Sequence, residues 1–104
     1  MSRHLLIGWT TVGSKAAAEK LAQGLVESGL VACVQVEGEV DSYFKWKGEL
    51  CHEQESQLMV KFAAANAEAV AKYMDAEHPY EVPEWIVVQP EAVAPAYLRW
   101  AMDG

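Results

Sequence analysis

The sequence predicts a single α+β domain, residues 1–104, with a ferredoxin-like βαββαβ fold. In this fold an antiparallel sheet is covered by two helices, and here a long hairpin projects and a short C-terminal helix follows. Two observations favour the fold. Apolar runs and helical patterns follow one another in the order strand, helix, strand, strand, helix, strand. A chain of 104 residues with 52% hydrophobic residues suits one core, and no repeat or linker divides it.

The first strand is predicted over residues 4–11, an apolar run too short for a secretory leader or a membrane span. Ser14 is expected to cap the helix that follows. One face of this helix carries Ala17, Ala18, Leu21, Ala22 and Leu25. Gly29 should end it, because glycine adopts the left-handed conformation at little cost. Residues 30–36 then begin the second strand.

Residues 38–62 are predicted to form a long hairpin with its turn at residues 47–49. Side chains of the return strand alternate between two faces. One face carries Ser56, Leu58, Val60 and Phe62, and the other carries Glu53, Glu55, Gln57, Met59 and Lys61.

The hairpin is too long to stay within a compact domain. A continuous strand over residues 30–47 would extend for roughly 55 Å, whereas a domain of this size has a radius of gyration of about 13 Å. Part of the hairpin must therefore project or bend, and Gly38 is the expected bend. The projecting half carries Tyr43, Phe44 and Trp46, which we expect a partner subunit to cover.

Asn66 is expected to cap a second helix that continues to Glu77 and buries Val70, Tyr73 and Met74. After a loop at residues 78–84, residues 85–89 are predicted to form the last strand. Pro95 suits the first turn of the terminal helix, which displays Tyr97, Leu98, Trp100 and Ala101.

The charge and the cysteine content limit the classes of partner and the compartment that we expect. Fifteen acidic against eight basic residues give a net charge of −7, which argues against nucleic acid and anionic membranes and favours cations. Cys33 and Cys51, without a CxxC pattern, indicate free thiols in a reducing compartment, so we expect a cytoplasmic protein. Cys33 lies in an apolar strand and is expected to be a small buried hydrophobe rather than a nucleophile.

The loop at residues 78–84, His-Pro-Tyr-Glu-Val-Pro-Glu, holds most of the site chemistry. Its two prolines restrict the residues before them to extended conformations, so the loop should be stiff. His78 could be a metal ligand or a proton carrier, but a histidine at a helix C-terminus is more commonly a capping cation. Glu55 and Lys61 share a strand face and could join a polar pocket or remain solvated.

Catalytic signatures such as GxSxG, HExxH or a phosphate-binding glycine loop do not occur in the sequence. We therefore expect no enzyme. The remaining catalytic hypothesis has His78 as a general base oriented by Glu84, and it ranks lowest.

Five segments resemble the CutA-like divalent-ion tolerance proteins, and together they extend over nearly the whole chain. They are residues 29–34 (GLVACV), 42–50 (SYFKWKGEL), 55–61 (ESQLMVK), 78–84 (HPYEVPE) and 97–100 (YLRW). The resemblance implies a ferredoxin-like fold, a homotrimer with strand pairing between subunits, and a link to copper and other divalent metals.

At the metal position the sequence departs from the family pattern. Some members carry a cysteine at the end of the first strand and two histidines before the Pro-Tyr, whereas the matching positions here are Thr10, Glu77 and His78. Threonine is a poor copper ligand and glutamate is a hard oxygen donor, so this set does not suit tight binding of soft Cu(I). At this position we therefore expect only weak binding of Cu(II) or another divalent cation, by His78 and Glu77.

The leading functional hypothesis is a homotrimeric cytoplasmic binding protein linked to divalent-metal tolerance. A metal ion or small polar ligand would bind near an intersubunit cleft lined by Cys33, Glu55, Lys61, His78, Tyr80 and Glu84. The alternative is a structural or signalling trimer that acts through protein partners and has no physiological metal site. The tight hairpin turn at residues 47–49 argues against this alternative, because signalling trimers of this fold use a long flexible loop.

Overall fold

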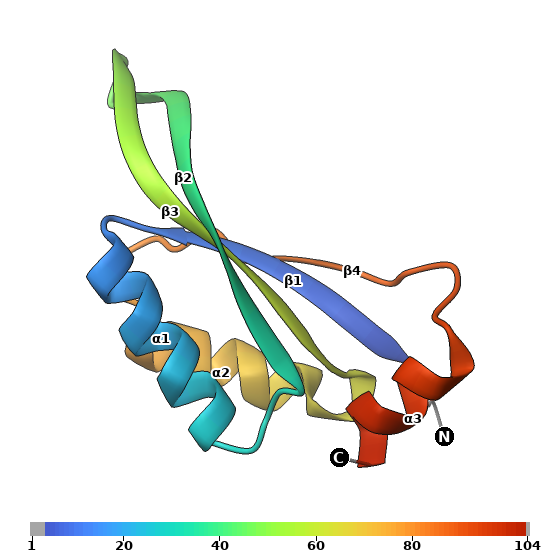
Figure 1. Cartoon of the computed structure of the whole chain (residues 1–104). Helices are drawn as coiled ribbons and strands as arrows, with labels where there is room; N and C mark the ends of the chain where they lie inside the picture. Colours follow the sequence, from blue (N-terminus) through green and yellow to red (C-terminus); the bar gives the residue numbers. More distant parts are fainter. Residues whose placement is uncertain (1–3, 104) are drawn as a thin grey trace.

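The computed structural model describes residues 4–103 and contains a four-stranded antiparallel sheet and three α-helices (Figure 1). The elements are β1 (Leu5–Val12), α1 (Lys15–Glu27), β2 (Cys33–Trp46), β3 (Glu49–Ala63), α2 (Ala67–Glu77), β4 (Ile86–Val88) and α3 (Pro95–Asp103), with a short 3-10 helix (Ala64–Asn66) before α2. The strands lie in the order β2-β3-β1-β4, and each neighbouring pair is antiparallel. The ferredoxin-like α+β fold is therefore confirmed.

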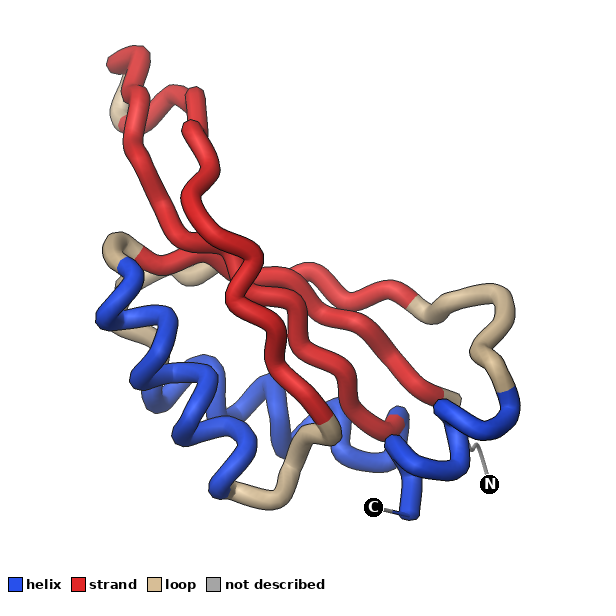
Figure 2. Tube along the Cα trace, in the orientation of Figure 1, coloured by secondary structure: helices blue, strands red, loops and turns tan. Residues whose placement is uncertain are grey.

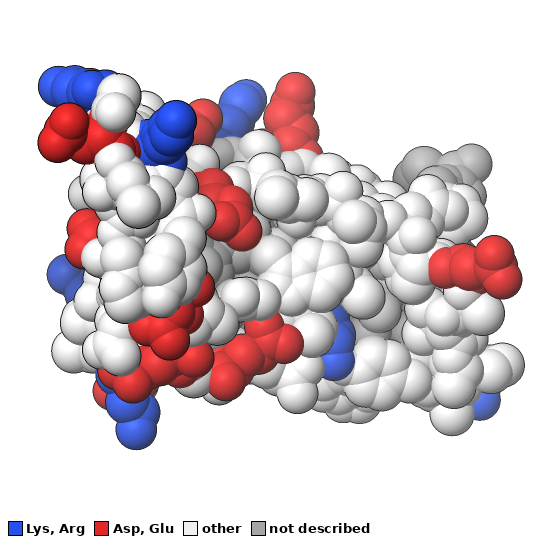
Figure 3. All heavy atoms as spheres, turned by 90° about the horizontal axis from the view of Figure 1, so that it is seen from above, with Lys and Arg blue, Asp and Glu red and all other residues white. Residues whose placement is uncertain are grey.

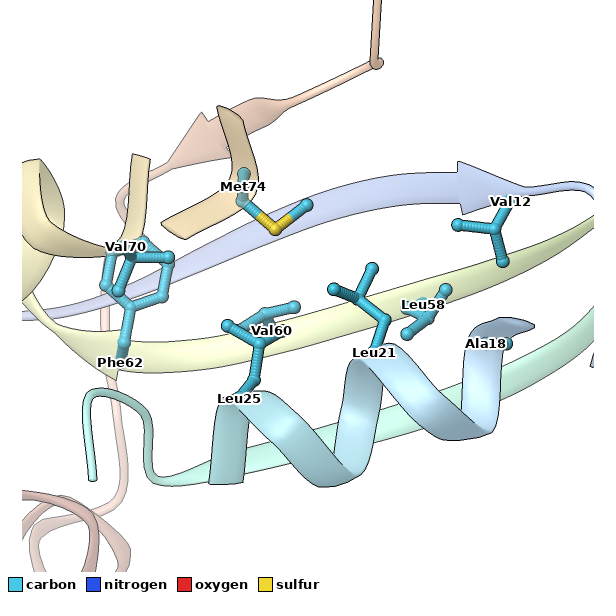
Figure 4. Packing of buried hydrophobic residues seen from close by; sticks show 9 residues of the cluster. All are labelled: Val12, Ala18, Leu21, Leu25, Leu58, Val60, Phe62, Val70 and Met74. Atoms are coloured by element: carbon cyan, nitrogen blue, oxygen red, sulfur yellow. The ribbon is translucent and has the colours of Figure 1, made fainter. Parts of the chain in front are cut away.

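The core lies between the sheet and the two helices that cover one of its faces, α1 and α2 (Figure 2). The alternation predicted for β3 is correct, because Ser56, Leu58, Val60 and Phe62 are all buried. Figure 4 shows side chains of α1 and α2 directed toward this strand. The buried cluster comprises Val12, Ala18, Leu21, Leu25, Leu58, Val60, Phe62, Val70 and Met74.

The first helix begins and ends as predicted. The Ser14 hydroxyl accepts a hydrogen bond from the Ala17 amide at 3.1 Å, and Gly29 follows the helix with φ of +77°. Asn66 lies at the predicted N-cap position, but the prediction that its side chain caps the helix is wrong. Asn66 precedes α2, but its side-chain amide donates to the Leu30 carbonyl at 3.1 Å instead of capping the helix. It therefore ties the start of α2 to the connection between α1 and β2.

Two strands are shorter than predicted. The second begins at Cys33. The Leu30 carbonyl bonds to a side chain rather than to a strand, and the first hydrogen bond to the sheet is from the Ala32 amide to the Lys61 carbonyl. The last is Ile86–Val88, an edge strand that pairs with β1 alone. The Trp85 indole, just ahead of β4, lies over Gly8, where a Cβ atom would overlap the ring.

The hairpin of β2 and β3 projects well beyond the rest of the sheet (Figure 1). Its turn consists of Lys47 and Gly48, which both have positive φ, as tight two-residue hairpin turns require. The molecule measures 45 × 27 × 23 Å along its principal axes, and its radius of gyration of 14.5 Å reflects this extension.

A β-bulge lies where the bend was predicted. Val36 pairs with Leu58 and Gly38 pairs with Gln57, so Glu37 is an extra residue, and Gly38 has φ of +101°. The extra residue reverses the alternation along β2. Ahead of the bulge Val36 shares the helix-covered face with Leu58. Beyond it the even-numbered residues lie on the opposite face, which α1 and α2 leave open.

Candidate functional site

His78 ends α2 and faces β1. Its backbone is extended (φ −70°, ψ 135°), as expected before a proline, and its amide donates to the Met74 carbonyl at 3.0 Å. The imidazole is buried, with 7% of the residue exposed. The ring therefore belongs to the contact between the loop and the sheet.

Both ring nitrogens of His78 are engaged. Nδ1 accepts a hydrogen bond from the Tyr80 amide at 3.0 Å, so the ring proton is assigned to Nε2. Nε2 lies 3.0 Å from the Thr11 carbonyl oxygen, to which it donates, and 2.9 Å from the Thr10 hydroxyl. The prediction of a capping cation is therefore wrong, because the imidazole is neutral and bonds to β1. This arrangement also leaves neither nitrogen a free lone pair for a metal.

The His78 environment makes stability depend on pH. Burial lowers the pKa of His78 below its ordinary value of 6.5, although the bond to Thr11 and the charge of Glu55 act in the opposite sense. As pH falls below 6.5, the unfolded chain therefore takes up a proton at this residue before the folded chain does. The contribution of His78 to the free energy of unfolding is complete above that pH. It declines below it, by at most about 1.4 kcal/mol per pH unit.

We expect this decline in urea unfolding measured between pH 7.5 and pH 5. His78→Gln, which removes this titration while His4 and His52 remain, is the reference. The difference in unfolding free energy between wild type and variant should shrink as pH falls. A difference that stays constant across the range would contradict the neutral assignment of His78.

Tyr80 ties the loop to β3. Its hydroxyl donates to Glu55 Oε2 at 2.7 Å, and its ring lies 5.1 Å from the imidazole of His78. Burial, together with the Glu55 carboxylate, raises the pKa of Tyr80 to about 12, so the hydroxyl stays protonated. His78, Tyr80 and Glu55 thus form one connected set, and the loop is fixed to both β1 and β3.

A groove of about 530 Å³ lies between the projecting half of the hairpin and this loop. It is lined by Thr11, Phe44, Trp46, Glu55, Pro79, Tyr80, Glu81, Val82 and Glu84. Three predicted pocket residues, Glu55, Tyr80 and Glu84, therefore meet in one place. In this view of the helix-free face most acidic side chains gather toward the hairpin end (Figure 3).

Phe44 and Trp46 were predicted only as interface residues, yet they form one wall of this groove. They are 39% and 52% exposed, and the bulge at Glu37 places them on the same face of the hairpin as Glu55. Tyr43, which is 69% exposed, points the other way and stacks on His52 with ring centroids 4.2 Å apart. The aromatic alternation was visible in the sequence, but without the register shift it did not indicate which rings face the loop.

Cys33 and Lys61 lie away from the groove. They are paired across β2 and β3, and the Lys61 ammonium lies 3.4 Å from the Tyr97 hydroxyl. Lys61 is six residues from Glu55 along β3, which corresponds to about 20 Å. Cys33 is a free thiol and only partly buried. Within one chain the six predicted pocket residues thus form two separate groups.

Neither the metal pair nor the acid-base pair is assembled in the described chain. Glu77 is exposed and lines a shallow hollow between α1 and α2. The hydrogen bonds of His78 go to Thr10, Thr11 and Tyr80 rather than to Glu84. Among residues 4–103 no group of three or more His, Cys, Asp or Glu side chains is placed to hold a metal ion.

Known proteins resemble this chain closely. It is 37% identical over 103 residues to a CutA homolog from Xenopus laevis, covering 99% of this chain and 68% of that protein. It is 34% identical to a divalent-cation tolerance protein CutA from Thermus thermophilus, covering 89% of this chain and 90% of that one. The chain spans about half of the longer relatives, 52% of both the mouse and the Arabidopsis thaliana proteins.

Solved structures share the architecture. CutA from Synechococcus elongatus superposes with a TM-score of 0.91 at 34% identity, covering 96% of this chain and 88% of that one. Within the described range no helix has the length and apolar character needed to cross a membrane. The family model described as CutA1 divalent ion tolerance protein matches residues 6–104. The chain therefore belongs to the CutA1 divalent ion tolerance family.

Proposed function

We propose that this chain works as a homotrimer in divalent-ion tolerance and that it binds a divalent cation or small polar ligand in the groove between hairpin and loop. Membership of the family supports the role in ion tolerance. The observation that carries the proposal is the groove itself, in which the connected pair Tyr80 and Glu55 lies beside unshielded aromatic side chains of the hairpin.

Uncovered apolar surface supports self-association. On the helix-free face of the sheet, the register places Ile7, Trp9, Met59, Ile86 and Val88 side by side. Figure 3 shows this face largely uncharged over the strands. The edges of β2 and β4 are also unpaired within the described chain, so each can bond to a strand of a second copy. The number three comes from the family resemblance.

Any divalent cation would be held by the groove carboxylates rather than by His78. Glu55 and Glu84 are oxygen donors, which suit hard or borderline cations, whereas both nitrogens of His78 are already bonded. One chain supplies fewer than three arranged donors in its described part, so water or a neighbouring subunit must complete the coordination. The two free thiols favour a reducing compartment, and we place the protein in the cytoplasm.

Light scattering coupled to size exclusion tests the assembly. At micromolar concentration we expect three times the mass of one chain, and a single-chain mass would overturn the trimer. The apparent melting temperature should also rise with protein concentration, because dissociation and unfolding are then coupled.

Calorimetric titration with Zn²⁺ and Cu²⁺ tests the cation. We expect weak binding to the wild type that is reduced in Glu84→Gln and retained in Glu91→Gln. Glu91 is a matched control because it is exposed and does not line the groove. Equal heats of binding in all three proteins would show that the groove does not bind the cation.

A further inference from the structure

We propose that Glu55 of each subunit forms an ion pair with Lys61 of the partner subunit, so that the groove of one chain is completed by a lysine from its neighbour. The inference rests on the proposed homotrimer, in which a partner covers the exposed rings of Phe44 and Trp46. It goes further, because it names the group that the partner supplies. Within one chain the two residues lie about 20 Å apart along β3, so the pair can form only between chains.

Glu55 lacks a counter-charge once the groove is covered. Its carboxylate lines the groove beside Phe44 and Trp46, and within the described residues only the Tyr80 hydroxyl bonds to it, at 2.7 Å. The described lining of the groove contains no Lys or Arg. A subunit that covers the two rings also takes this carboxylate out of water, and a carboxylate held away from water requires a positive charge beside it. The covering subunit is therefore expected to bring that charge.

Lys61 is the positive charge that the helix-free face offers. In the four strands as described, Lys and Arg occur only as Lys45 and Lys61. Lys45 lies on the same side of the hairpin as Tyr43, turned away from the groove, whereas Lys61 lies on the helix-free face with Met59. The Lys61 ammonium is 3.4 Å from the Tyr97 hydroxyl and 5.4 Å from the centroid of the Tyr97 ring. No carboxylate among residues 4–103 pairs with it, so this half-buried cation also lacks a counter-charge.

The two unpaired charges lie toward opposite ends of the helix-free face. Glu55, Glu81 and Glu84 line the groove at the hairpin end, and Lys61 lies farther along β3, opposite the start of β1. A largely uncharged stretch of the sheet lies between the two ends (Figure 3). In a closed ring of three, every interface joins two different patches of the same chain. Complementary charges on two such patches fix which end of one subunit meets which end of the next. Glu81 and Glu84 then remain for a ligand.

Exchanging the two charges tests the pair. Lys61→Glu and Glu55→Lys each place like charges at every interface, so each should raise the concentration at which half of the trimer dissociates by at least about a hundredfold, as measured by light scattering. The double variant Lys61→Glu/Glu55→Lys should recover the assembly of the wild type to within about tenfold. Lys72→Glu is the matched control, because it makes the same charge change at an exposed position of α2, and its assembly should not change. Far-UV circular dichroism checks that each variant is folded.

Mixing the two single variants tests whether the pair joins different chains. In a ring of three that contains both variants, one interface carries the exchanged charges, one carries the original charges and one remains repulsive. The mixture should therefore assemble at a lower concentration than either variant alone, whose rings have three repulsive interfaces. Equal assembly of the mixture and of the two separate proteins would overturn the pair.

A milder cycle serves if a reversed charge prevents folding. Glu55→Gln removes the charge but keeps an oxygen that can accept the Tyr80 hydrogen bond, and Lys61→Gln removes the opposite charge. Each should weaken the trimer about tenfold or more, because it leaves the other charge unpaired in the interface. Together they should weaken it by less than the product of the two single effects. Independent effects that multiply would contradict a direct pair.

The outcomes separate this inference from the proposed homotrimer. A wild-type protein with the mass of one chain would overturn both. A wild-type trimer whose assembly is unchanged in Lys61→Glu would overturn the pair alone and leave the trimer in place. A double variant that is folded but stays as dissociated as the single variants would also overturn the pair, because exchanged charges should attract as the original ones do.

Discussion

Replacing His78 by alanine is expected to lower the free energy of unfolding by about 2 to 5 kcal/mol in the absence of any metal. The substitution removes a buried ring and leaves the Tyr80 amide and the Thr11 carbonyl without the partners they have in the folded chain. Urea unfolding in a buffer with chelator measures the loss. The size of the effect follows from burial, because polar groups that lose their partner away from water cannot be rehydrated at low cost.

His52→Ala is the matched control for this prediction. His52 lies exposed on the hairpin, where it bonds to Asp41 at 3.1 Å and stacks on Tyr43. Its loss should cost no more than about 1 kcal/mol. If His78→Ala were as stable as His52→Ala in chelator and differed from wild type only with added Cu²⁺, the structural role assigned to His78 would be wrong and a metal ligand would be indicated.

Phe62→Ala is expected to lower the free energy of unfolding by about 3 to 5 kcal/mol. Phe62 is fully buried near the C-terminal end of β3 and belongs to the buried cluster, and its ring lies 5.9 Å from the Trp85 ring, measured between centroids. Removing it leaves a cavity between the sheet and α2 that the paired strand cannot close. Chemical denaturation monitored by far-UV circular dichroism would measure the loss.

Leu50→Ala provides the comparison for Phe62→Ala. Leu50 lies at the hairpin tip and is 77% exposed, so its truncation should change the unfolding free energy by less than about 0.5 kcal/mol. A loss of stability for Phe62→Ala close to that of Leu50→Ala would mean that the core does not depend on β3 as described. A large loss for Leu50→Ala would instead place the hairpin tip inside an assembly.

The elements that depend on local signals were predictable from the sequence. The alternation of β3, the Ser14 cap, the turn after Trp46 and the bend at Gly38 each depend on residues that are neighbours along the chain. In each case the periodicity or the backbone preference of glycine is visible without knowledge of the rest of the fold.

The contacts of the candidate site were less predictable because they join distant segments. The bonds of His78 to β1 connect residues 67 and 68 positions apart, and the bond of Tyr80 to Glu55 connects residues 25 positions apart. The sequence indicated that the loop is stiff and polar. It did not indicate that the imidazole turns toward β1, nor that Asn66 bonds to the Leu30 carbonyl across 36 positions.

The single extra residue at Glu37 separates two sets of constraints along one continuous strand. Residues ahead of it, such as Val34, pack against the core and must preserve its volume, whereas Phe44 and Trp46 lie on the opposite face and are not part of it. Substitutions beyond the bulge can therefore alter what the groove recognises while leaving the packed layer intact. Deleting Glu37 would remove the bulge and its local bend but not this separation, since Gly38 would still pair with Gln57 and both rings would stay on the face of Glu55.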